Sequence, residues 1–86
     1  MSAPAEVTLY TREGCHLCDE ARDEILALRR SGLAIELREV DIEADERLHA
    51  RFLERIPVIE VGGEVVSELG CDEPALRAAI TSGNGR

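Results

Sequence analysis

The chain has 86 residues, of which 44% are hydrophobic and 33% are charged, so it is long enough for one small folded domain. It has ten arginines and no lysine against 18 Asp and Glu residues in total, so the net charge is −8. This acidic balance argues against nucleic acid or an anionic membrane surface as a partner, because both attract an excess of positive charge. We expect a single domain over 1–86, with flexible tails at 1–5 and 81–86.

The sequence also narrows the compartment in which the chain works. No apolar stretch approaches membrane-spanning length, and the first residues lack the charged and apolar regions of a signal peptide. Three cysteines, an odd number, fit poorly with a secreted scaffold held by disulfides. We therefore expect a cytoplasmic protein, in which a close pair of cysteines is more often catalytic or metal-binding.

In the first half of the chain, apolar spacing predicts a strand, a helix and a second strand. Alternation predicts the strand over 6–10, and helical spacing predicts the helix over 16–30, which ends near Gly32. Leu17 shares the helical spacing, so we interpret it as part of the packed face of this helix. Renewed alternation predicts the second strand over 34–42.

The second half predicts a short helix, a β-hairpin and a last helix. The short helix lies between Asp45 and Pro57, because the residue before a proline avoids the helical region. Strands over 57–61 and 64–67 flank a Gly-Gly turn, and Asp72 begins the last helix. The order β-α-β-α-β-β-α predicts an α/β fold, a four-stranded mixed sheet flanked by three helices.

The most informative motif is the stretch from Cys15 to Cys18, at the junction between the first strand and the first helix. Residues three apart in a helix lie on the same side, within the Cα separation that a disulfide tolerates. The unpaired amides at the start of a helix also stabilise a thiolate, which is the reactive form of cysteine. We expect Cys15 to be the more exposed of the two thiols. The motif indicates a thiol pair for disulfide exchange.

Three segments together resemble the glutaredoxin family on the thioredoxin fold: the run from Leu9 to Cys18, the triplet Ile56-Pro57-Val58 and the triplet Gly70-Cys71-Asp72. The resemblance implies that Cys15 attacks a disulfide and that Cys18 resolves the mixed disulfide. It also implies that Pro57 is cis and lies beside the thiols. In that arrangement Ile56 offers its backbone to an extended substrate segment.

The resemblance also implies a set of candidate glutathione contacts. Arg12 stands where the family has a lysine, and Gly70, Cys71 and Asp72 stand in the loop that meets the glutamyl carboxylate of glutathione. This loop has one glycine where the family has two, which favours a thioredoxin-like electron source over glutathione. Arg12 is also interpretable as a partner of the thiolate or as a surface residue, and we favour Cys71 as a buried filler over a third redox thiol.

These observations predict a thiol–disulfide oxidoreductase, a monomeric enzyme that reduces protein or glutathione mixed disulfides. Its partners would be proteins that contain a disulfide, together with glutathione or a flavoprotein reductase as the reductant. The prediction includes no bound cofactor and no metal, with glutathione as a possible co-substrate. The alternatives are a module that binds zinc or an iron-sulfur cluster through Cys15, and an adaptor that has the fold without the chemistry.

Overall fold

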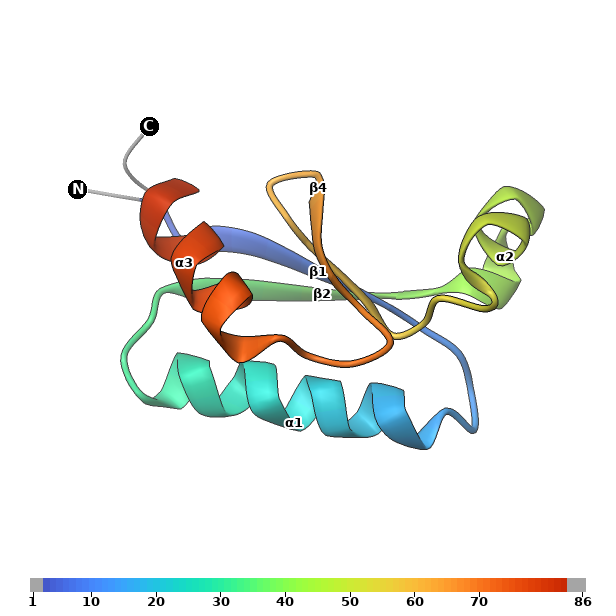
Figure 1. Cartoon of the computed structure of the whole chain (residues 1–86), viewed down its shortest axis with the longest axis horizontal. Coiled ribbons are helices and arrows are strands. Elements are labelled where there is room, and N and C mark those ends of the chain that lie inside the picture. Colours follow the sequence, from blue (N-terminus) through green and yellow to red (C-terminus); the bar gives the residue numbers. More distant parts are fainter. Residues whose placement is uncertain (1–2, 84–86) are drawn as a thin grey trace.

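The computed structural model describes residues 3–83 of the chain. They form one four-stranded mixed sheet, three α-helices and a short 3-10 helix (Figure 1). In chain order the elements are β1 (Ala5–Thr11), α1 (His16–Arg30), β2 (Ile35–Asp41), the 3-10 helix (Ile42–Ala44), α2 (Glu46–Phe52), β3 (Val58–Val61), β4 (Glu64–Glu68) and α3 (Glu73–Gly83). The predicted order and fold class are confirmed.

The strands lie in the order β2-β1-β3-β4, so β1 is central. It pairs in parallel with β2 and antiparallel with β3, and β3 and β4 form the predicted hairpin. Because β1 and β2 are parallel, the chain must return between them, and α1 makes that crossover. The end of β1 therefore leads directly into the start of α1.

The ordered core extends further toward both ends of the chain than the sequence predicts. Ala5 was expected in a flexible tail, but it begins β1, is buried, and donates its N–H to the carbonyl of Ala34 at 2.9 Å. Residues 81–83, expected in the other tail, belong to α3. The remaining tail residues, 1–2 and 84–86, lie outside the described residues. Figure 1 shows the start of β1 and the end of α3 on the same side of the molecule, opposite the end where α1 begins.

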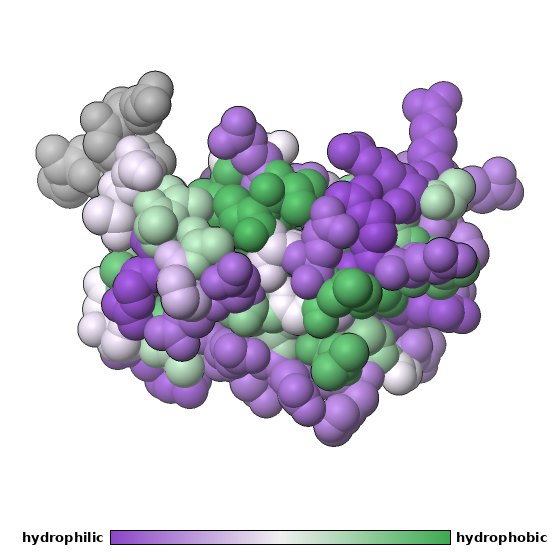
Figure 2. All heavy atoms as spheres, in the orientation of Figure 1, coloured by the Kyte–Doolittle hydropathy of each residue, from purple (hydrophilic) through white to green (hydrophobic). Residues whose placement is uncertain are grey.

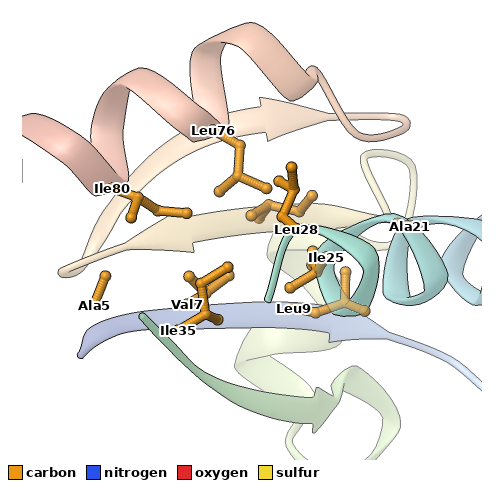
Figure 3. Close-up of a cluster of buried hydrophobic side chains, with 10 residues drawn as sticks. Ala5, Val7, Leu9, Ala21, Ile25, Leu28, Ile35, Leu76 and Ile80 are labelled. Carbon is orange, nitrogen blue, oxygen red and sulfur yellow. The ribbon is translucent and has the colours of Figure 1, made fainter. Parts of the chain in front are cut away.

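The main hydrophobic core lies between the sheet and the helices α1 and α3. Figure 3 shows side chains from β1, α1 and α3 converging on this space, and the buried set is Ala5, Val7, Leu9, Ala21, Ile25, Leu28, Ile35, Ile59, Leu76 and Ile80. They comprise the alternating positions of β1, one residue each from β2 and β3, and one face each of α1 and α3. The packing fixes the direction of α1 and thus the position of its first turn.

The prediction that Leu17 packs into this core is wrong, since its side chain is 50% exposed. The buried stripe of α1 consists of Cys18, Ala21, Ile25 and Leu28. Cys18 occupies the inward position in the first turn. Leu17 precedes it by one residue, which on a helix is a rotation of about 100° away from the core.

The opposite face of the sheet is covered at one end only. There α2 packs Phe52 against Val58 and Tyr10, and the rings of Phe52 and Tyr10 stack with centroids 4.5 Å apart. Beyond α2 the face carries a polar hollow of about 360 Å³ that includes Thr8 and Glu60 among its lining residues. No helix within residues 3–83 is both long and apolar enough to cross a membrane.

Candidate functional site

A tight turn at the end of β1 places Cys15 directly before the first residue of α1. Gly14 has φ +82°, a conformation that residues with a Cβ rarely adopt, and the N–H of Cys15 donates to the carbonyl of Arg12 at 3.1 Å. Cys15 itself has an extended backbone and is the N-cap of α1. Its side chain thus lies at the helix end where backbone N–H groups lack partners.

Cys15 and Cys18 form a disulfide, with their Cα atoms 5.2 Å apart. The N–H of Cys18 donates to Sγ of Cys15 at 3.1 Å, so the helix end directs a donor at this sulfur. Cys18 is fully buried, whereas Cys15 is partly exposed. The predicted asymmetry is confirmed, since Cys15 is the more exposed of the two cysteines.

The register of the sheet brings Pro57 to the same end of the molecule. Tyr10, near the end of β1, pairs with Val58, the first residue of β3, so Pro57 lies just beyond the paired residues. Pro57 is buried, and the Ile56–Pro57 peptide bond is cis, as the resemblance implied. The segments that carry the disulfide and the cis proline therefore share one end of the sheet (Figure 1).

The backbone of Ile56 is only partly available for an extended substrate. Its N–H donates to the carbonyl of Phe52 at 3.0 Å, which continues the hydrogen bonding of α2, and its side chain packs on the Phe52 cluster. Within residues 3–83 the carbonyl of Ile56 accepts no backbone hydrogen bond. Of the two groups that strand addition would use, the carbonyl is the one left open.

The segment from Gly70 to Asp72 is held by a residue that the sequence did not single out. Ser67 is buried; its hydroxyl donates to the carbonyl of Gly70 at 2.5 Å and accepts from the N–H of Asp72 at 2.9 Å. The carboxylate of Asp72 accepts from the N–H of Ala75 and so caps α3. The only signal for Ser67 in the sequence is a small polar residue in the last predicted strand.

Cys71 has the surroundings of a packing residue. It is half-buried, contacts the main core, and is the one free cysteine of the described chain. Burial raises the pKa of its thiol to about 11, and the nearby carboxylates of Glu24, Glu73 and Asp72 act in the same direction. At neutral pH it stays protonated, which supports its interpretation as a filler.

The basic side chains near the motif are engaged with glutamates. Arg12 pairs with Glu43 of the 3-10 helix at 2.5 Å, and both side chains are about half exposed. His16, which is 85% exposed, pairs with Glu20 one turn along α1 at 3.0 Å. Among residues 3–83, no cluster of three His, Cys, Asp or Glu side chains could hold a metal ion.

A family model described as glutaredoxin-like domain (DUF836) matches residues 6–81, nearly the whole described chain. An uncharacterized protein of Mycobacterium tuberculosis is 33% identical over 85 residues, which cover 93% of this chain and 86% of that protein. These matches extend over the disulfide, the cis proline and the segment from Gly70 to Asp72.

Solved structures share the same architecture. Protein Ne2328 from Nitrosomonas europaea superposes with a TM-score of 0.81 at 26% identity, over 93% of this chain and 95% of that one. A glutaredoxin from Brucella melitensis superposes with a TM-score of 0.52 at 31% identity, over 95% of this chain and 83% of that one. The fold and the Cys15–Cys18 pair together fit a redox role.

Proposed function

This chain belongs to the glutaredoxin-like domain family, and on that premise we propose that it is a thiol–disulfide oxidoreductase. One observation carries the proposal: a partly exposed cysteine caps α1 and is bonded to a fully buried cysteine one turn later. The helix end provides N–H groups that favour a thiolate at Cys15, and the burial of Cys18 restricts the first attack to the outer sulfur.

The reduced protein would act in two exchange steps. The Cys15 thiolate attacks one sulfur of a substrate disulfide, a bond forms between these sulfurs, and the other substrate sulfur leaves as a thiolate that takes up a proton. Cys18 then loses its proton and attacks the sulfur of Cys15, which closes the internal disulfide and releases the second substrate thiol. Two electrons pass from the Cys15–Cys18 pair to the substrate, and no bound cofactor is needed.

A reductant must return the pair to the dithiol form after each cycle. Two molecules of glutathione could do so and become glutathione disulfide, or a flavoprotein reductase could deliver two electrons through its own dithiol. Two features support the reductase as electron source. The loop has one glycine, Gly70, where the family has two, and the guanidinium of Arg12 is paired with Glu43, so fewer groups are free to bind a glutathione carboxylate. We propose that the protein carries out this cycle as a monomer in the cytoplasm.

Substitution of each cysteine tests the proposal. With a protein mixed disulfide as substrate, Cys15→Ser should lower the rate of reduction by at least about a hundredfold, because the remaining thiols are the buried Cys18 and the protonated Cys71. Cys18→Ser should keep the first step and accumulate a covalent adduct with the substrate, seen as a mass increase on Cys15. Equal activity of Cys15→Ser and the unmodified protein would rule out the proposed mechanism.

The metal content of protein purified without oxygen provides the necessary control. Zinc or iron and sulfide bound in proportion to protein, and lost in Cys15→Ser, would favour the binding-module alternative. Exchange activity in metal-free protein would support the oxidoreductase. An adaptor would show neither property.

A further inference from the structure

Leu69 combines two unusual properties in one residue. It has φ +63°, and no other non-glycine residue among 3–83 has a positive φ. Its side chain is 62% exposed, more than the other exposed large hydrophobic residues of the described chain, Leu17 and Val65. The left-handed conformation is unfavourable for a side chain with a Cβ, and glycine would relieve it at once. The sequence nevertheless keeps a large apolar side chain there.

The backbone of Leu69 is fixed beside the cis proline. Glu68, the last residue of β4, pairs with Val58, and the N–H of Leu69 donates to the carbonyl of Arg55 at 3.0 Å. These contacts place Leu69 at the end of the sheet that carries the disulfide. The main chain is thus held in position while the side chain is left in solvent.

A second exposed apolar side chain belongs to the motif itself. Leu17 lies between the two cysteines and is 50% exposed. Figure 2 shows hydrophobic atoms at the surface over the connection between β4 and α3. When a binding partner covers apolar surface that is otherwise exposed to water, the free energy of the complex falls.

Two of the arginines at this end are already engaged by carboxylates. Arg12 is paired with Glu43, and Arg55 is paired with Glu68 through two hydrogen bonds. Glutathione carries two carboxylates and has no large apolar side chain, so it would gain little from Leu69. A polypeptide with an apolar residue next to its cysteine would cover the exposed leucine.

We propose that Leu69 is a specificity-determining residue that contacts an apolar side chain next to the disulfide of an extended polypeptide substrate. This inference rests on the proposed function and names its substrate class. The carbonyl of Ile56, which is open on the adjoining segment, is available to hold the substrate backbone while Leu69 contacts a side chain.

The test uses the reduced full-length protein and three disulfides. Two are synthetic peptides with one cysteine that is disulfide-bonded to thionitrobenzoate, and they differ only in the residue next to that cysteine, which is Leu in one and Ser in the other. The third is glutathione disulfide. Leu69→Gly and Leu69→Asn both tolerate a positive φ, so neither substitution threatens the fold. Val65→Ala, at the other end of β4, is the matched control because it also trims an exposed apolar side chain.

In the unmodified protein and in Val65→Ala we expect the Leu peptide to react roughly tenfold faster than the Ser peptide, which corresponds to partial burial of one leucine. Both Leu69 variants should bring this ratio close to one, and Leu69→Asn, which adds no second glycine beside Gly70, should leave the rate toward glutathione disulfide unchanged. A ratio that survives in both variants, or an equal fall in all three rates, would overturn the inference. Failure of the unmodified protein to react with any of the three disulfides would instead overturn the proposed function, and the inference with it.

Discussion

At the scale of single residues, the three cysteines show how position determines chemistry. Cys15 is partly exposed at a helix end, Cys18 is buried beneath it, and Cys71 is half-buried against the main core. In the proposed function the same type of side chain would serve as an attacking group at Cys15, as a resolving group at Cys18 and as a filler at Cys71. The difference lies in which charged or apolar groups surround each sulfur.

Alkylation of Cys71 should be slow at neutral pH and should speed up only in strong base. Its pKa of about 11 leaves a smaller thiolate fraction than in free cysteine, so we expect a rate at pH 7 that is lower by about a hundredfold or more. The rate should rise about tenfold per pH unit until the pH approaches that pKa.

The measurement uses iodoacetamide with the variant in which Cys15 and Cys18 are both replaced by Ser, so that Cys71 is the only thiol. Unfolding in urea serves as the control and should restore the rate of free cysteine. If the folded variant reacted as fast as the unfolded one, burial would not govern the thiol of Cys71.

The residues of the site were predictable to different degrees. The pair Cys15–Cys18 was identified from its spacing at a strand-helix junction, and the cis Pro57 was implied by the resemblance to the glutaredoxin family. The ion pair of Arg12 with Glu43 and the conformation of Leu69 depend on elements that meet only in the folded chain. Sequence spacing carries no information about such contacts.

At the scale of elements, one buried hydroxyl makes two of the hydrogen bonds that hold the connection between β4 and α3 in place. Ser67 holds Gly70 and Asp72 at once, and this positions Leu69 between a strand and a helix that are both packed on the core. The connection is therefore a braced segment. Its bracing is the reason that an exposed leucine can keep an unfavourable backbone conformation.

Ser67→Ala should destabilise the protein by about 1–2 kcal/mol, because it leaves a carbonyl and an N–H without their partner. Ser31→Ala is the matched control: Ser31 also donates to a backbone carbonyl, that of Leu28, but at the exposed end of α1. We expect the control to lose less than about 0.5 kcal/mol. Urea unfolding measures both values, and equal losses would contradict a bracing role for Ser67.

Helix α1 shows why element boundaries were easier to predict than the faces of elements. Its start and end agree with the prediction, since a turn and a glycine delimit it. One residue of its buried face was misassigned, because Leu17 was counted as the first packed residue of the stripe in place of Cys18. The true stripe from Cys18 to Leu28 leaves Leu17 outside.

At the scale of the whole molecule, two hydrophobic clusters lie on opposite faces of one sheet. The larger joins α1 and α3 to the sheet, and the smaller joins α2 to it through Phe52. The small cluster lies under the segment that leads to Ile56 and Pro57, so its packing holds one wall of the candidate site.

Phe52→Ala should lower the free energy of unfolding by about 3–5 kcal/mol, a large share of the stability of a domain of this size. Tyr10 stacks on Phe52 and is the only tyrosine in a chain without tryptophan, so its fluorescence reports on this cluster. Arg51→Ala, which removes an exposed cation over the same ring, is the control and should lose about 1 kcal/mol or less. A loss below about 1 kcal/mol in Phe52→Ala would show that α2 is held by other contacts.

The start of β1 and the end of α3 lie opposite the disulfide, which has a practical consequence. Ala5 begins β1 at one end of the sheet, α3 finishes nearby, and Cys15 follows β1 at the other end (Figure 1). An affinity tag or a resin linkage that continues from the start of β1 or the end of α3 would therefore be attached at the end of the sheet away from Cys15. The Cys18→Ser variant, immobilised in this way, becomes a bait whose covalently captured proteins can be eluted with dithiothreitol and identified.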